Sequence, residues 1–174
     1  MIHAASITPD PVDQRALRTA LGRFATGVTV VTTARDGEVH AMTANAFTSV
    51  SLAPPLVLVS IDHRTHMHEL LPDTRHFGVS VLASDQERTA WHFAGRPMAD
   101  AADMFVWHGD VPLVHGAIAH VACTLYDAHA AGDHTLYLGE VQSIEDRPGA
   151  PLLFHGGEFG RISPEPALAE SWGW

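Results

Sequence analysis

The stretch from Gly37 to Ile61 reads GEVHAMTANAFTSVSLAPPLVLVSI, and it places a small polar cluster between two segments of strand character. The polar groups are hydroxyls and one amide, and they belong to Thr43, Asn45, Thr48, Ser49 and Ser51. The alanines among them leave room for the backbone to approach a ligand closely. A segment of this kind can wrap a polar, phosphate-bearing molecule.

The residues just before this stretch predict a hairpin. The run from Val28 to Ala34 is rich in β-branched residues, and strand character resumes up to Met42. Between them, Asp36-Gly37 is typical of a two-residue hairpin turn. Further upstream, Asp10 is expected to cap a helix of about three turns that begins at Pro11. Its apolar face is formed by Leu17, Leu21 and Phe24.

The rest of the chain predicts strands interrupted by short helices. The expected elements are a strand over 56–61 that is buried on both sides, a short helix over 65–71 ended by Pro72, a strand over 77–82, a helix opened by the capping box Ser84-Asp85-Gln86-Glu87, long antiparallel strands over 117–126 and 136–144 joined by Ala131-Gly132-Asp133, and a last short strand over 159–162.

This order favours a mainly β protein with short helices, built as a closed or partly closed antiparallel barrel. No GxGxxG motif follows a predicted strand, so a doubly wound nucleotide-binding fold is not supported.

Four motifs in register make the chain similar to a known family. They are Gly27-Val28-Thr29-Val30-Val31-Thr32, the stretch 37–61, Gly132-Asp133-His134-Thr135, and Pro151-Leu152-Leu153-Phe154-His155-Gly156-Gly157. Over about Leu17 to Ile162 the chain resembles the flavin reductase-like family, small NAD(P)H:flavin oxidoreductases that feed reduced flavin to a separate monooxygenase. The resemblance implies an FMN-binding split barrel, a Greek-key antiparallel β-barrel of about six strands. It also implies a homodimer with flavin near the subunit interface.

The expected domain boundaries follow from the same resemblance. One flavin reductase-like domain is expected over residues 1–163. Residues 164–174 lack periodicity and are expected to form a C-terminal tail, which Trp172 and Trp174 could anchor on the body or on a partner subunit.

The resemblance also implies a flavin site. The residues implied to line it are Thr43, Ala44, Asn45, Ala46, Ser49 and Ser51 along the first polar stretch, Ser60, Ile61 and Asp62 as the continuing wall, Thr65 and His66 at a helix start that favours an anion, and His92 and Phe93 near the ribityl or adenine part. Each residue has a simpler alternative. Asn45 and Ser49 could satisfy a turn, Phe93 could be a core aromatic, and Thr65 could cap an ordinary connector.

The nicotinamide half of the site is implied to come from two other segments. In the resembling family the histidine of the Gly-Asp-His motif lies beside the nicotinamide, which assigns a positioning role to His134. The second segment is Phe154, His155, Gly156 and Gly157, where glycines permit close approach of the backbone. The alternative is that His134 is a solvated turn residue.

Composition excludes several classes of function. The formal net charge is −10, with only ten Lys and Arg residues and no lysine at all, which opposes nucleic-acid binding. No apolar run approaches the roughly 20 residues that span a bilayer. A single cysteine and no recognisable leader indicate a reducing, cytoplasmic setting. The triplet His63, His66 and His68 superficially resembles metal ligands, but His63 and His66 are expected to share a helix face while His68 turns away, so no metal is predicted.

The sequence therefore predicts an enzyme that transfers hydride from NADH, or less favourably NADPH, to FAD or FMN and releases the reduced flavin to a partner monooxygenase. Two alternatives stay open: a split-barrel protein with tightly bound flavin acting on a small organic substrate, and a non-enzymatic flavin-binding module.

Overall fold

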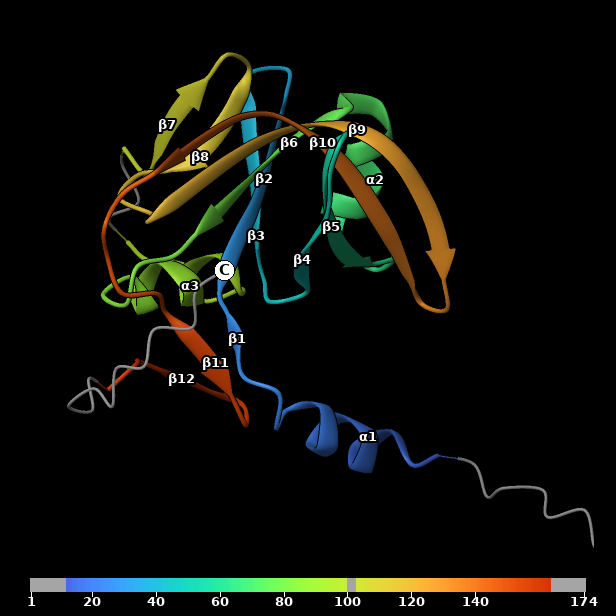
Figure 1. The fold of residues 1–174 in the computed structure, drawn as a ribbon, viewed down its shortest axis with the longest axis vertical. Coiled ribbons are helices and arrows are strands. Elements are labelled where there is room, and N and C mark those ends of the chain that lie inside the picture. Colours follow the sequence, from blue (N-terminus) through green and yellow to red (C-terminus); the bar gives the residue numbers. More distant parts are fainter. Residues whose placement is uncertain (1–11, 100–102, 164–174) are drawn as a thin grey trace, which may run out of the picture.

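The computed structural model describes residues 12–99 and 103–163, and Figure 1 shows a curled antiparallel sheet flanked by short helices. The described elements are α1 (Gln14–Leu21), β1 (Thr26–Gly27), β2 (Thr29–Arg35), β3 (Glu38–Ala44), β4 (Phe47–Leu52), β5 (Pro55–Asp62), α2 (His66–Thr74), β6 (His76–Val81), α3 (Glu87–Phe93), β7 (Phe105–His108), β8 (Val111–Val114), β9 (Ala119–Ala131), β10 (His134–Asp146), β11 (Leu153–His155) and β12 (Glu158–Gly160). The predicted mainly β fold with short helices is confirmed.

The main sheet has seven strands, one more than expected, in the order β3-β2-β6-β9-β10-β5-β4. Its two edge strands, β3 and β4, are consecutive in the sequence and are separated only by Asn45 and Ala46. The sheet must therefore curl until its edges meet at this corner, although the edges do not pair with each other. We call the gap between β3 and β4 the seam.

Strand β2 shows why the barrel holds together. Its residues 29–33 are all buried, because alternate side chains enter two different cores. Val31 packs inside the barrel with Phe77 and Tyr137. Val30 packs on the other face with Leu82 and with Ala90 of α3.

The hairpin turn was predicted correctly. Strands β2 and β3 pair antiparallel up to Arg35 and Glu38, and both turn residues have positive φ, 54° at Asp36 and 82° at Gly37. These are the left-handed conformations that a type I′ turn requires.

The helix boundaries differ from the predictions. Helix α1 has eight residues and is capped by Asp13, whose side chain accepts from Ala16 N at 2.9 Å; Asp10 and Pro11 lie outside the described residues. Its apolar residues, with Phe24 after it, are exposed in the single chain.

Helix α2 does not end at Pro72 but continues through it to Thr74. Proline lacks the N–H that would bond the carbonyl four residues earlier. That carbonyl belongs to His68, and it accepts instead from the Tyr137 hydroxyl at 3.2 Å. The tertiary contact therefore compensates for the missing helical bond.

The predicted capping box before α3 is wrong. The Ser84 N–H donates to the Ala150 carbonyl, and the Gln86 side chain accepts from Ala83 N, so neither residue caps the helix with its side chain. Pairing of this segment with the chain near Pro151 decides its geometry instead.

Three further differences concern strands. The hairpin β7–β8 was not predicted, because its residues carry no clear alternation. Strands β9 and β10 run further than expected, to the turn at Gly132 and Asp133, and residues 126–131 are exposed on both faces as a projecting arm. The last strand β12 is Glu158–Gly160 rather than 159–162.

Of the helices within 12–99 and 103–163, none combines the length and the apolar character needed to cross a membrane. The expected tail over 164–174, with Trp172 and Trp174, lies outside the described residues.

Candidate functional site

The corner between β3 and β4 is held in place from both sides. The Thr43 hydroxyl donates to the Ala90 carbonyl of α3, and the Thr29 hydroxyl donates to the Ala44 carbonyl, each at 2.7 Å. The Ala46 carbonyl accepts from Ser60 N at 3.0 Å. In the described chain no hydrogen bond occupies the exposed Asn45 amide. The corner thus presents a free amide on a fixed backbone.

A large cleft opens at this corner. It has a volume of about 700 Å³ and joins α1 and β1 to the corner and to strands β4 and β5. We call it the seam cleft, and its lining residues are Arg18, Leu21, Gly22, Phe24, Thr26, Asn45, Ala46, Phe47, Thr48, Leu58, Ser60 and Phe154. Most of its surface is apolar, with polar atoms near Asn45 and Ser60, which suits a flat, largely apolar ring with a polar edge.

A smaller cleft of about 260 Å³ continues from the seam cleft and shares Asn45 and Phe154 with it. We call it the aromatic cleft; it is also lined by Val28, Thr43, Ala44, Trp91, Ala94, Gly157 and Phe159. The Trp91 ring meets Phe159 edge-on, with centroids 5.0 Å apart, and Arg96 lies 3.8 Å above Trp91. The β11–β12 hairpin therefore packs against α3 through an aromatic contact.

A third cleft, of about 420 Å³, lies further along β3 and brings together Thr65, His66, His92 and Phe93. We call it the histidine cleft. Thr65 caps α2 by accepting from His68 N at 3.4 Å, so the positive end of the helix dipole faces this region. His66 pairs with Glu69 at 2.9 Å and meets the His40 ring edge-on.

The tip of the β9–β10 hairpin carries His134 opposite Asp62 of β5. Asp133 lies 2.7 Å from His134 Nδ1, and the hydrogen bond from His134 lowers the pKa of the Asp133 carboxyl. The Arg64 guanidinium donates to both oxygens of Asp62 and holds the pKa of that carboxyl well below its usual range. Arg64, which stands just before the cap residue of α2, is therefore already paired.

The structure brings part of the predicted set together. The residues that line the three clefts are Thr43, Ala44, Asn45, Ala46, Ser60, Thr65, His66, His92, Phe93, Phe154 and Gly157. Seven others do not line them: Ser49, Ser51, Ile61, Asp62, His134, His155 and Gly156. The Ile61 side chain is fully buried in the barrel, so only its backbone could face a ligand. Within one chain, the β9–β10 tip and the β11–β12 hairpin lie on different sides of the molecule (Figure 1).

Sequence reasoning missed several lining residues. Arg18, Leu21 and Phe24 enter the seam cleft from the α1 region, and the apolar spacing of Leu21 and Phe24 was the available signal. Thr26 gave no signal. Its hydroxyl is buried without a hydrogen-bond partner, which is rare for a polar atom in a native protein.

The expectation for the histidine triplet is wrong in its geometry. His63 and His68 pack together, with ring centroids 4.7 Å apart, while His66 points toward Glu69 and His40. His63 precedes the helix rather than lying on it. His63 and His68 bond Thr135 and Tyr137 respectively, so they connect α2 to β10.

Comparison with known proteins identifies the fold. The family model described as the flavin reductase like domain matches residues 21–163. The chain belongs to the flavin reductase-like family. Among solved structures of this family, the flavin reductase PheA2 superposes with a TM-score of 0.83 at 42% identity, covering 87% of this chain and 99% of that one. The mainly antiparallel split-barrel assignment is thereby confirmed.

Similar proteins of the flavin reductase-like family have described activities. An NADH-dependent flavin reductase from a Rhodococcus species is 53% identical over 146 residues, covering 82% of this chain and 83% of the relative. The NADH:FAD oxidoreductase of Streptomyces globisporus C-1027, solved in complex with NAD and FAD fragments, matches with a TM-score of 0.82 at 42% identity and covers 91% of this chain and 100% of that one. The reductase component of a 4-nitrophenol monooxygenase from Rhodococcus opacus is 36% identical, covering 88% of this chain and 84% of the relative.

Proposed function

We propose that this protein is an NADH-dependent flavin reductase that transfers hydride from NADH to FAD or FMN and releases the reduced flavin to a separate monooxygenase. Hydride transfer requires the nicotinamide and flavin rings to stack with their reacting atoms roughly 3–3.5 Å apart. The protein's task is to position the two rings and exclude water. Family membership and the activities of the similar proteins support this function.

The observation that carries the proposal is the row of three clefts along β3. Residues 43–45 line the aromatic cleft and residues 39–42 line the histidine cleft, while Asn45 also opens into the seam cleft. The row is broad and apolar at the seam and polar at the start of α2. A flavin nucleotide has the same polarity along its length, from flat ring to phosphate.

We place the flavin ring at the seam, against Ala44, Asn45 and Ala46, with Thr43 fixing the backbone there. Ser60 continues the wall. Thr65 and His66 would meet phosphate through the free N–H groups of the first turn of α2. His92 and Phe93 would contact the ribityl or adenine part. Ser49, Ser51, Ile61 and Asp62 support this site through the backbone of β4 and β5 rather than through direct contact.

The nicotinamide would enter beside Phe154 and Gly157; His155 ends β11, and Gly156 and Gly157 form the turn of the same hairpin. His134, the second predicted contact, lies elsewhere in one chain. We therefore propose a homodimer in which the β9–β10 arm of one subunit brings His134 to the nicotinamide held by the β11–β12 hairpin of the other.

The proposed flavin is exchangeable, with FAD preferred over FMN. Near the start of α2 the Arg64 side chain is engaged by Asp62 and the His66 side chain by Glu69. No arginine is among the described residues that line the histidine cleft. Phosphate is then held mainly by backbone N–H groups, which favours release. The preference for FAD requires His92 and Phe93 to meet the adenine rather than the ribityl chain, because FMN has no adenine.

Stopped-flow and steady-state kinetics with both free flavins and both pyridine nucleotides test the proposal. We expect rapid turnover of free FAD with NADH, slower turnover with NADPH, and loss of flavin from the purified protein on dialysis. Asn45→Leu should weaken flavin binding, whereas Asn45→Asp should retain part of it by keeping one oxygen acceptor. Stoichiometric flavin that survives extensive dialysis, with no turnover of added flavin, would contradict the proposed release to a partner.

A further inference from the structure

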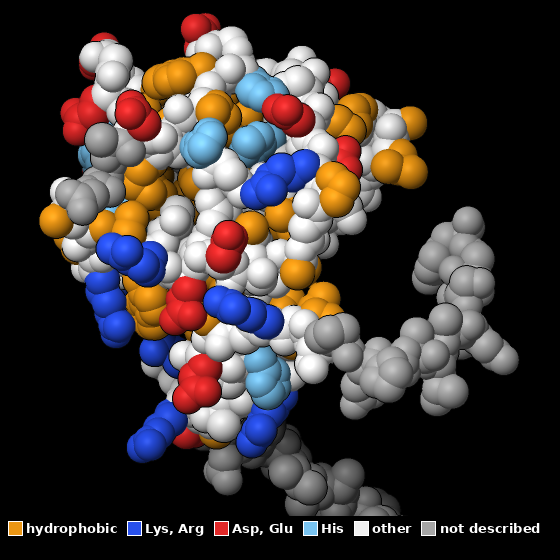
Figure 2. Space-filling model, turned by 90° about the vertical axis from the view of Figure 1, so that its left-hand side faces the viewer, with side chains coloured by type: hydrophobic (Ala, Val, Ile, Leu, Met, Phe, Trp, Pro, Cys, Tyr) orange, Lys and Arg blue, Asp and Glu red, His pale blue; other side chains and the backbone are white. Residues whose placement is uncertain are grey.

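A cluster of possible metal ligands lies away from the three clefts, where β7 meets β9 and β10. His108 ends β7, and His120 of β9 stands directly opposite Glu145 of β10 in the strand register. The two imidazoles and the carboxylate each direct one ligand atom to a common point, with all three atoms within 4.8 Å of one another. Figure 2 shows histidine and acidic side chains side by side on the face that includes β7 and β8.

The hydrogen bond made by His120 fixes which of its nitrogens is free. His120 Nε2 lies 2.8 Å from the Val114 carbonyl, which can only accept, so Nε2 carries a proton. In the neutral ring, Nδ1 then presents a lone pair. That lone pair faces Glu145 Oε2 at 3.8 Å, so two electron-rich atoms face each other in a place where His120 is only 8% exposed.

His108 has the same arrangement and faces the same carboxylate oxygen. Its Nε2 lies 3.0 Å from Glu145 Oε2, and its Nδ1 lies 3.4 Å from the Ser143 hydroxyl. Both rings therefore have an oxygen behind them that can accept the second N–H. A metal-ligating histidine almost always donates its other N–H to an oxygen, which fixes the tautomer and raises the basicity of the ligating nitrogen.

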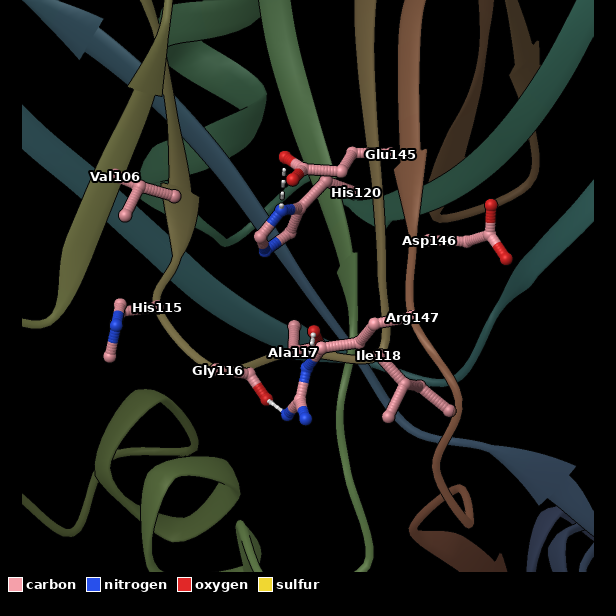
Figure 3. Close-up of a pocket in the computed structure, with 9 residues that line it drawn as sticks. All are labelled: Val106, His115, Gly116, Ala117, Ile118, His120, Glu145, Asp146 and Arg147. Carbon is pink, nitrogen blue, oxygen red and sulfur yellow. Dashed lines mark hydrogen bonds and ion pairs between the residues drawn. The ribbon is translucent and has the colours of Figure 1, made fainter.

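The neighbouring Arg147 guanidinium does not pair with the Glu145 carboxylate. Arg147 donates to the carbonyls of Gly116 and Ala117, as Figure 3 shows, and Glu145 points toward His120 instead. In the described chain, the ion-pair partners of Glu145 are the two histidines alone. A cleft of about 460 Å³ borders His120 and Glu145 and leaves access for water.

From this geometry we propose that His108 Nε2, His120 Nδ1 and Glu145 form a binding site for Zn²⁺, with water as the fourth ligand. Two imidazoles and one carboxylate are a donor set that zinc accepts in tetrahedral coordination. Calcium and magnesium prefer oxygen ligands throughout and fit this set poorly. The ion would fasten the β7–β8 hairpin to the barrel strands β9 and β10.

Zinc titration of the tag-free chain by calorimetry tests this site. We expect one tight site per chain, a d–d absorption spectrum typical of tetrahedral coordination when Co²⁺ is used instead, and a melting temperature about 5–10 °C higher at a free zinc concentration of about 100 times Kd. Glu145→Gln and His108→Asn should each weaken zinc binding at least about 10- to 100-fold, the loss that removing even an outer partner of a ligand causes.

Two variants serve as matched controls. His129→Ala removes a histidine that also pairs with a carboxylate, that of Asp127, but without a third ligand. His115→Ala removes a histidine that lines the adjacent cleft without entering the cluster. Both should leave zinc binding unchanged. Flavin reductase turnover that persists in Glu145→Gln and His108→Asn shows that these variants fold. Absence of tight zinc binding by the parent chain, or equal binding by the parent and both ligand variants, would overturn the proposal and leave the cluster as an ion pair.

Discussion

His134 is held at the β9–β10 tip by Asp133, and this contact directs the ring before any ligand arrives. We expect His134→Ala to lower kcat/KM for NADH about 3- to 100-fold, because a positioning hydrogen bond contributes about 0.5–1.5 kcal/mol, or up to roughly 3 when charged. Hydride transfer needs no proton from this residue, so turnover should persist. Steady-state kinetics at saturating FAD, with fluorescence quenching for FAD affinity, measures both effects.

His129→Ala is the matched control for this prediction, since His129 lies on the same arm and pairs with its own aspartate. It should leave kcat/KM for NADH unchanged. If His134→Ala instead weakened FAD binding tenfold at unaltered NADH kinetics, the assigned role would be wrong.

Cys123 packs inside the barrel beside Phe77, and burial raises the pKa of its thiol to about 12. Only the thiolate is an effective nucleophile. We therefore expect Ellman's reagent at pH 8 to leave the folded protein unmodified and to titrate one thiol after unfolding in guanidinium chloride. Rapid modification of the folded chain would show that the barrel interior opens readily.

The same thiol links stability to alkaline pH. Its pKa is about 12 in the folded state against an ordinary value of 9.0, so the unfolded chain loses this proton first. The free energy of unfolding is unaffected by this group below about pH 9 and falls as the pH rises toward 12.

Site residues could be predicted from the sequence where they lie within one recognisable motif. They could not be predicted where their position depends on contacts between segments that are distant in the sequence. Asn45 and Ala46 lie at the seam as their motif implied. Ile61 is in the same implied set, but its side chain points into the core because strand alternation places it there. Thr26 could not have been found, since its place beside Phe154 depends on the pairing of β1 with β11, more than a hundred positions later in the sequence.

Glycine at position 139 allows a close approach inside β10. A Cβ there would lie 2.8 Å from the Cys123 Cβ and closer still to the Phe77 ring, both in the buried core. We expect Gly139→Ala to destabilise the fold by about 1–3 kcal/mol through overpacking. Chemical denaturation checks this, with Gly160→Ala as control, because nothing lies within 4 Å of a Cβ at that position. Equal stability of the two variants would mean that Phe77 can move aside.

Among the elements, those with strong local signals were predicted and those that depend on partners were not. The Asp36–Gly37 turn needs only its own two residues. The end of β9, residues 126–131, has no buried face, so its sequence shows no alternation, yet backbone pairing with β10 continues to the tip. Pro72 appeared to end α2 because the Tyr137 hydroxyl that stabilises the His68 carbonyl is distant in the sequence.

We expect the whole molecule to sediment as a homodimer at micromolar concentration. The single chain exposes large apolar side chains on the edge strand β4, on the β9–β10 arm and next to α1, including Leu52 at 95%, Phe24 at 78% and Tyr126 at 54%. Burial of such surface favours association. A fully active monomer would contradict both the dimer and the proposed sharing of the nicotinamide site.

Mixing two impaired variants tests the sharing directly. His134→Ala and Phe154→Ala chains, each folded by circular dichroism, are unfolded and refolded together. If each nicotinamide site combines His134 of one subunit with Phe154 of the other, half of the dimers are mixed and each mixed dimer has one intact site. Activity should then return to about a quarter of the parent value. Activity no greater than that of the separate variants would place both residues in one subunit's site.

The two-residue corner at Asn45 and Ala46 makes the seam a wedge. Three peptide bonds join Ala44 to Phe47, so the chain limits the opening there to about 11 Å, whereas the gap between β3 and β4 can widen with distance from the corner. Twisting of the sheet therefore changes the separation of β3 and β4 far from the corner and leaves their separation at the corner almost constant. The position of a ring held at the corner is therefore set by covalent bonds. The contacts to the remainder of the ligand depend instead on the width of the gap between β3 and β4, which changes as the sheet twists.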